Sequence, residues 1–289
     1  MVRTREKDFP ALLETAWALN PLAGKNAPRR ARALVRQAGV RPGGLVFLAP
    51  TGAGLLPLAF LAAGARVAAT DPDPLARFVT RALCQPVSLP ALVRAAAEVL
   101  EEAGVDKPPD LFPPPHAPER LRRALETRPP GPDRDMLALV LFRAAADAVS
   151  APISPRPGVP LAEASLKPAF EKALEAALEF TREKNRLLAF VPLADRPHDL
   201  DGPGLCLPAG GMDDIAGAME PEVVVACLAS PEEPGEALRR FMEPLVPGAE
   251  TGRPAEAENP LNRLFPLKEA WPQARWLALA AQGRRDRAL

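Results

Sequence analysis

The sequence predicts a mixed α/β protein with a parallel sheet and a block of helices inserted between its strands. Short uncharged apolar runs at residues 45–48 and 223–228 predict the sheet, because continuous apolar strands are typical of parallel sheets buried on both faces. The first run leads through a glycine-rich turn into an apolar helix and a second strand. The stretch 91–185, in contrast, is predicted to be helical between two proline-rich connectors at residues 107–118 and 151–160.

Glycine and proline punctuate the N-terminal third of the chain. Gly39 ends a helix that begins after a proline-containing loop, and Gly64 ends the apolar helix that follows the glycine-rich turn. The elements expected in this third are helices at residues 9–19 and 29–38, a strand at 45–48, a helix at 55–63 and a strand at 66–70.

The rest of the chain is expected to be helical first and then to return to the sheet. Leu166, Phe170, Leu174 and Leu178 recur every four residues and mark the longest helix. The expected helices start after Pro90 and continue at 118–127, 134–149 and 161–184; the expected later elements are strands at 187–192, 205–208, 222–229 and 275–280, with a helix at 235–242. We therefore expect residues 1–90 and 186–289 to form one domain, with residues 91–185 as a helical insertion.

Composition excludes some classes of function and leaves others open. The 289 residues carry 36 basic and 36 acidic side chains, so bulk charge gives no reason to expect a polyanion partner. Local basic clusters keep a nucleic-acid partner possible, and a protein partner also stays open; the clusters are Arg29, Arg30 and Arg32, and Arg284, Arg285 and Arg287.

Location and source are predicted from the same composition. No apolar run reaches the ~18–20 residues of a membrane span, and the N-terminus leads into no signal-peptide core, so a cytoplasmic protein is expected. Abundant proline (37 residues), no tyrosine and a preference for arginine suggest a thermophilic source. Cys84, Cys206 and Cys227 are expected to be buried free thiols.

A glycine pair and one carboxylate form the main candidate site. Gly52 and Gly54 lie where the strand at 45–48 turns into a helix, and Asp71 follows the next strand. Glycines at such a turn let a ligand approach the backbone, the helix start offers free amides, and the carboxylate can accept hydrogen bonds from a ribose. The spacing predicts a Rossmann-type nucleotide-binding unit, although Pro57 stands where a dinucleotide site has a third glycine.

Residues 45–76 resemble the cofactor motif of bacterial DNA amino-methyltransferases, from the Thr-Gly-Ala-Gly turn to Asp-Pro-Asp-Pro-Leu-Ala. Residues 20–28 are similar to the family segment that cradles the methionine part of the cofactor, and 223–231 to the strand that delivers the catalytic tetrapeptide. The resemblance implies a Rossmann-like methyltransferase sheet with helices on both faces and S-adenosylmethionine as cofactor. It assigns Gly52, Gly54, Asp71 and Lys25 to the cofactor, and Ser230 and Pro231 to the catalytic motif.

Four departures from the family pattern affect the chemistry. Leu48 replaces the acid that ends the first strand, Pro50 replaces an aromatic, and Gly210-Gly211-Met212 replaces Gly-Asp-Ala. In the tetrapeptide, Glu232 and Glu233 replace the second proline and the aromatic that would stack a flipped base. Leu48 and Pro50, together with Leu22, are expected to fill the cofactor pocket.

We therefore expect a degenerate methyltransferase-like protein that has lost the cofactor and acts as a binding or scaffold subunit, in a nucleic-acid-handling assembly. The alternative is an active methyltransferase on DNA, RNA or protein, with Asp71 at the ribose and Ser230 at the acceptor. A dinucleotide enzyme is a third reading, which Pro57 disfavours. No metal site is predicted, because the acid pairs Asp213-Asp214 and Glu232-Glu233 are expected to be solvated or capping carboxylates at strand ends.

Overall fold

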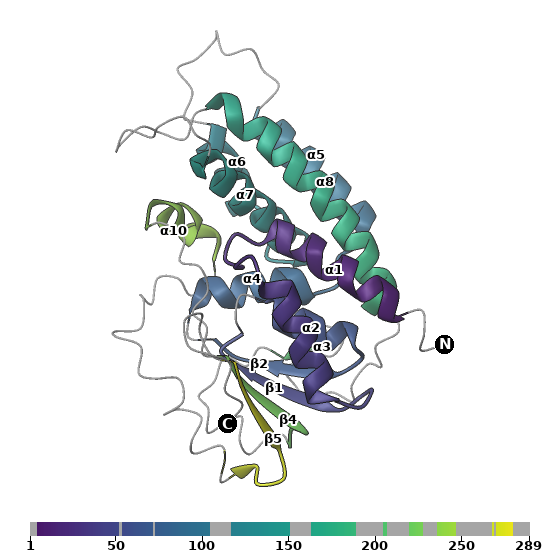
Figure 1. Ribbon diagram of the computed structural model, residues 1–289. Helices are drawn as coiled ribbons and strands as arrows, with labels where there is room; N and C mark the ends of the chain where they lie inside the picture. The colour runs from purple at the N-terminus through teal and green to yellow at the C-terminus, as the bar shows by residue number, and fades with distance from the viewer. Residues whose placement is uncertain are drawn as a thin grey trace.

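The computed structural model describes residues 5–51, 54–71, 73–104, 117–150, 163–188, 205–206, 220–227, 236–246, 268 and 270–279. These residues form a mixed α/β structure in which helices stand over a small sheet (Figure 1). The chain thus belongs to the α/β class that the apolar strand runs predicted. In the described residues, no helix is long and apolar enough to cross a membrane.

The sheet is parallel throughout its described part, with strand order β3-β2-β1-β4-β5. The strands are β1 (Leu45–Ala49), β2 (Arg66–Ala69), β3 (Leu205–Cys206), β4 (Val223–Cys227) and β5 (Arg275–Leu279). Val46 on the central strand pairs with Val67 on one side and with Val223 on the other. The chain thus builds outward from β1 in one direction and returns to add β4 and β5 in the other.

Nine described α-helices surround this sheet or extend from it. They are α1 (Arg5–Leu19), α2 (Ala27–Ala38), α3 (Leu55–Ala62), α4 (Pro74–Cys84), α5 (Leu89–Glu102), α6 (Ala117–Glu126), α7 (Pro132–Ser150), α8 (Glu163–Leu188) and α10 (Glu236–Met242), and a 3₁₀ turn, η2 (Glu243–Leu245), follows the last. Helices α5 to α8 lie between β2 and β3 in the chain, which confirms the helical character predicted for this stretch, and they are called the inserted helices below.

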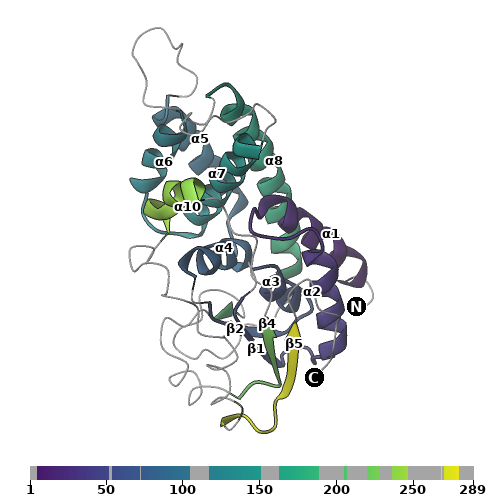
Figure 2. The ribbon, with the colours of Figure 1, turned by 60° about the vertical axis from the view of Figure 1, so that its left-hand side comes forward.

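The two faces of the sheet have different neighbours, because successive strand residues point to opposite sides. Val46 and Leu48 belong to the large core that includes side chains from every described α-helix. Phe47 belongs to a smaller cluster on the opposite face, where its ring meets that of Trp271 edge-on at 5.1 Å between centroids. The described helices therefore lie on one face, where the sequence led us to expect helices on both (Figures 1 and 2).

The inserted helices share their core with the sheet. Helix α7 is the central element: it packs along α8 and also contacts α4, α5 and α6. Its residues 136–142 are all fully buried, which explains why its sequence shows no polar stripe. Helix α8 also packs against α1, so the insertion rests on the sheet-covering helices (Figure 2).

Two elements differ from the sequence prediction. The strand expected at residues 187–192 is wrong at its start, because α8 runs to Leu188 and buries Leu187 in the core; residues 189–192 lie outside the described ranges. Helix α4 was not predicted at all. Its signal is nevertheless present: Asp73 caps the first turn by accepting a hydrogen bond from the Leu75 amide, and Pro74 starts the helix.

Candidate functional site at the carboxyl edge of the sheet

The candidate site lies where β1 and β2 end, at the carboxyl edge of the parallel sheet. Thr51 follows β1 and Asp71 follows β2, and the two strands pair in register up to Leu48 and Ala69. Adjacent parallel strands bring the residues after their ends together, and sites in open α/β sheets form at this edge. The register thus places the predicted carboxylate beside the predicted glycine-rich turn.

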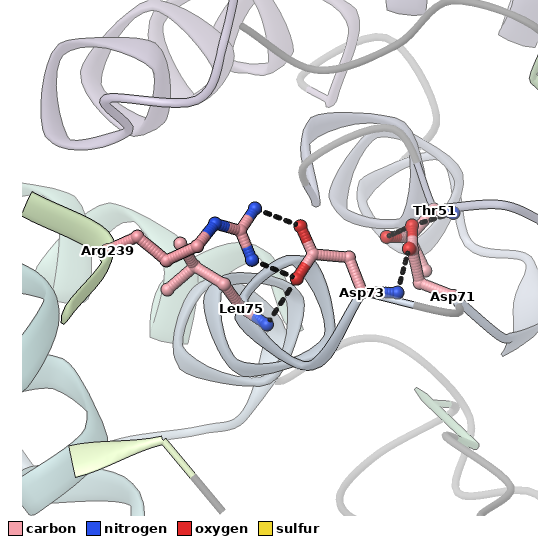
Figure 3. A network of polar contacts seen from close by, with 5 residues as sticks. All are labelled: Thr51, Asp71, Asp73, Leu75 and Arg239. Atoms are coloured by element: carbon pink, nitrogen blue, oxygen red, sulfur yellow. Dashed lines mark hydrogen bonds and ion pairs between the residues drawn. The ribbon is translucent and has the colours of Figure 1, made fainter. Parts of the chain in front are cut away.

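The Asp71 carboxylate bonds to the chain's own groups. Its Oδ2 accepts hydrogen bonds from the backbone N–H and the hydroxyl of Thr51, both at 2.9 Å, and its Oδ1 accepts one from the Asp73 amide at 2.9 Å (Figure 3). The residue is only 5% exposed. Burial raises the pKa of Asp71, while the hydrogen bonds from Asp73 and Thr51 oppose that rise. Both oxygens are thus already bonded without a ligand.

A second layer of contacts holds this arrangement. Thr80 Oγ1 lies 3.0 Å from Thr51 Oγ1 and 2.8 Å from the Ala76 carbonyl oxygen, which ties α4 to the β1 turn. Arg77 donates to the backbone carbonyl of Asp71 at 2.7 Å. The turn after β1, the end of β2 and the first turns of α4 therefore form one connected polar unit.

Asp73 connects this unit to α10, which comes 166 residues later in the chain. Arg239 donates through both terminal nitrogens, at 3.0 and 2.8 Å, to the two carboxylate oxygens of Asp73 (Figure 3). Burial alone would raise the pKa of Asp73, but its bonds to Arg239 and to the Leu75 amide bring it below the ordinary value. The bidentate ion pair thus fixes α10 over the start of α4.

Gly54 is required by packing within the protein. It adopts φ +83°, and a Cβ atom placed on it would lie 2.9 Å from the Cα of Thr80. From the sequence, this glycine was expected to allow the close approach of a cofactor. In the structure, the backbone that approaches it belongs to α4, and the Cys84 sulfur lies 4.0 Å from the Gly54 carbonyl oxygen.

Of the remaining predicted residues, the structure describes Lys25, Leu22, Leu48 and Pro50. Lys25 is exposed in the turn before α2, and its predicted cofactor contact stays a prediction. Leu22 and Leu48 are buried core residues and Pro50 is half-buried, and the expectation that the three fill a cofactor pocket stays a prediction. Gly52, Ser230 and Pro231 lie outside the described residues.

Sequence reasoning missed most partners of Asp71. The Asp-Pro-Asp-Pro run carried a usable signal, because an Asp before Pro is a typical helix start. Thr51, Thr80 and Arg239 carried none, since each becomes meaningful only when α4 and α10 fold over the sheet edge.

A separate polar group is buried under α4. The Lys184 ammonium of α8 donates to the carbonyl oxygens of Gln85 at 2.6 Å and Ala82 at 3.4 Å, and it lies 5.0 Å from the centre of the Phe180 ring. Burial lowers the pKa of Lys184 to about 7, and burial raises that of the neighbouring Cys84 to about 12. Lys184 therefore bonds the carbonyls at the C-terminal end of α4.

Within the described residues, no group of three or more His, Cys, Asp or Glu side chains could hold a metal ion. In comparisons with known proteins, no family model, curated protein or solved structure matches the chain. The function is therefore argued from the geometry of the site and from the resemblance carried by its motifs.

Proposed function

We propose that the protein is a Rossmann-like, methyltransferase-related protein that no longer uses S-adenosylmethionine and acts by binding other molecules. The strand order supports the Rossmann-like part of this proposal, since strands in the order 3-2-1-4-5 are also found in nucleotide-binding Rossmann sheets. The motif resemblance over residues 45–76 supports the methyltransferase relationship.

The observation that carries the loss of the cofactor is the bonding of Asp71. The Asp71 carboxylate is 5% exposed, and the Thr51 and Asp73 donors take three of its about four acceptor positions. A ribose diol donates two hydrogen bonds, so it would have to displace at least one of these donors. Each donor left buried without a partner costs about 1–3 kcal/mol. A cofactor would therefore have to offset at least one such loss, and the burial of the carboxylate, before it gained any affinity.

Two further features oppose a cofactor at this edge. The backbone of α4 occupies the space next to Gly54 that a ligand would approach. Leu48 supplies no hydrogen-bond acceptor where the family has an acid, and it is fully buried. The site thus keeps the scaffold of a nucleotide-binding edge while its polar groups serve the fold.

Titration calorimetry with S-adenosylmethionine and S-adenosylhomocysteine tests the proposal. We expect no saturable heat in the micromolar range, and no transfer of a tritiated methyl group to DNA, RNA or protein. Micromolar binding together with methyl transfer to any of these would falsify the proposal. A binding-competent methyltransferase assayed in parallel controls for the quality of the cofactor.

The alternative function is an active methyltransferase with an altered site. It is favoured by the position of Asp71, which follows the strand next to β1 as a ribose-binding carboxylate would. If it is correct, the Asp71→Ala variant loses both cofactor binding and methyl transfer, while the exposed Glu175→Ala variant keeps them.

A further inference from the structure

Helix α2 presents a solvent face made of arginines. Of its twelve residues, four are arginine and none is acidic. Pro28, Ala31, Leu34 and Ala38 are buried, so helical spacing puts the arginines together on the opposite side. Helix α2 packs against α1 and α3 through its apolar side (Figure 1).

The charges of this face are not neutralised within the described part of the chain. Arg32 pairs with Glu14 of α1 at 3.4 Å, whereas no ion pair joins Arg29, Arg30 or Arg36 to any described residue. Lys25, which precedes the helix, is exposed as well. Because the whole chain has zero net charge, this concentration is a local feature.

Helix α4 provides a contrast. It also carries arginines and no acid, but Arg81 pairs with Asp135 at 2.6 Å and Arg77 donates to the Asp71 carbonyl oxygen. The arginines of α4 therefore have structural partners. On α2, by contrast, Arg29 and Arg36 are exposed and Arg30 is half-buried, on a helix whose apolar side is already packed. Contacts within the fold explain the arginines of α4, but they do not explain Arg29, Arg30 and Arg36 of α2.

We propose that the arginine face of α2, formed by Arg29, Arg30 and Arg36, binds the phosphate backbone of a nucleic-acid duplex. The residues from Arg29 to Arg36 span about 10 Å of helix axis, and a duplex presents one phosphate charge per ~1.7 Å of its axis. A duplex thus carries about six phosphates over this length of its axis, counted on both strands, and three contacts to them are within reach of one helix face. Guanidinium groups are well suited to phosphate oxygens, since they donate in a planar fork.

Other anionic partners fit this face less well. An amphipathic helix binds a membrane by inserting its apolar side, but that side of α2 is buried in the core. A protein interface has an apolar centre. Among the described residues, the exposed large hydrophobic side chain is Val93 of α5, so the outer face of α2 offers no such centre. The positions beside the arginines on the outer face of α2 hold only Ala33 and Gln37.

Fluorescence anisotropy with a labelled, mixed-sequence DNA duplex tests the proposal on the full chain. With three phosphate contacts, log K should fall with log salt at a slope of about −2.7, which is about 40-fold in affinity between about 50 and 200 mM salt. The triple variant Arg29→Gln, Arg30→Gln, Arg36→Gln should lose at least about tenfold in affinity at the lower salt and most of the slope.

The matched control is Arg94→Gln, Lys172→Gln, Arg182→Gln, which changes three exposed basic residues on α5 and α8 and gives the same net charge. It should bind like the wild type, and thermal unfolding followed by circular dichroism checks that both variants are folded. Equal loss in both variants, or no wild-type binding at the lower salt, overturns the proposal. Binding to poly-glutamate or phosphatidylserine vesicles as tight as to the duplex also overturns it.

This inference does not depend on the proposed loss of the cofactor, because α2 lies outside the Asp71 unit. Methyl transfer by the wild type would contradict the proposed function and leave duplex binding by α2 intact. Failure of duplex binding in the anisotropy experiment would leave the calorimetric result unchanged.

Discussion

Asp71 is a residue whose position suggests one role and whose contacts support another. Its place after β2 is that of a ribose-binding carboxylate, yet it accepts hydrogen bonds from Thr51 and Asp73 and is almost fully buried. A carboxylate in such a position can hold a strand end, a turn and a helix start together. Asp71 thus occupies the position of a ribose-binding carboxylate, but its contacts stabilise the fold.

Replacement of Asp71 by asparagine should destabilise the protein. The amide keeps the shape of the carboxylate but places an NH₂ group against donors from Thr51 or Asp73, so at least one buried donor loses its acceptor. We expect the free energy of unfolding to fall by about 1–3 kcal/mol, measured by urea denaturation. Glu175→Gln, an exposed change on α8, should stay within about 0.5 kcal/mol of the wild type. Equal stability of Asp71→Asn and wild type would contradict the structural role.

At the scale of elements, α4 determines the shape of the sheet edge. It starts at the Asp73 cap, crosses the β1 turn at Gly54 and ends over Lys184 of α8. Its arginines reach the β2 end and helix α7. The helix therefore connects the turn that was expected to bind a cofactor with the inserted helices.

Gly54→Ala tests how closely α4 packs on the turn. The new methyl group would meet the Thr80 backbone at 2.9 Å, and the residue would keep a φ of +83°. The matched control is Gly39→Ala, at φ +51° with nothing within 4 Å of the added Cβ, which isolates the cost of the left-handed backbone. We expect Gly54→Ala to lose about 1–3 kcal/mol of unfolding free energy beyond the control. If the two variants lose the same unfolding free energy, α4 shifts to accommodate the new methyl group, which would contradict the prediction of tight packing.

At the scale of the whole molecule, the sequence was informative where structure is local. The apolar runs at β1 and β4 predicted strands because their pattern is continuous and uncharged, and leucine and phenylalanine at every fourth residue predicted α8. These local patterns do not indicate on which face of the sheet a helix lies. That the described helices lie on one face depends on how the long insertion packs against the rest of the chain.

The candidate site was less predictable than the fold for the same reason. Asp71 was found from its distance along the chain from a glycine turn, but the ion pair of Arg239 with Asp73 joins residues 166 positions apart. Helix α4 combines a predictable and an unpredictable feature. Its N-terminal cap can be recognised from the sequence, while the approach of its backbone to Gly54 follows only from tertiary packing.

The contact between the inserted helices and the rest of the molecule should make stability depend on pH through Lys184. Burial lowers its pKa in the folded protein from 10.5 to about 7, so between these values the unfolded chain binds more protons and stability rises with pH. Lys184→Met removes the charge but keeps the length. The stability of the wild type relative to this variant should rise from pH 7 to 10, by at most about 1.4 kcal/mol per pH unit. The loss of the bonds to Gln85 and Ala82 adds only a constant offset.

Urea denaturation at a series of pH values measures the difference, and Lys172→Met, exposed on the same helix, should follow the wild type. A flat difference between wild type and Lys184→Met would mean that the ammonium keeps its ordinary pKa through its bonds to the carbonyl oxygens at the end of α4.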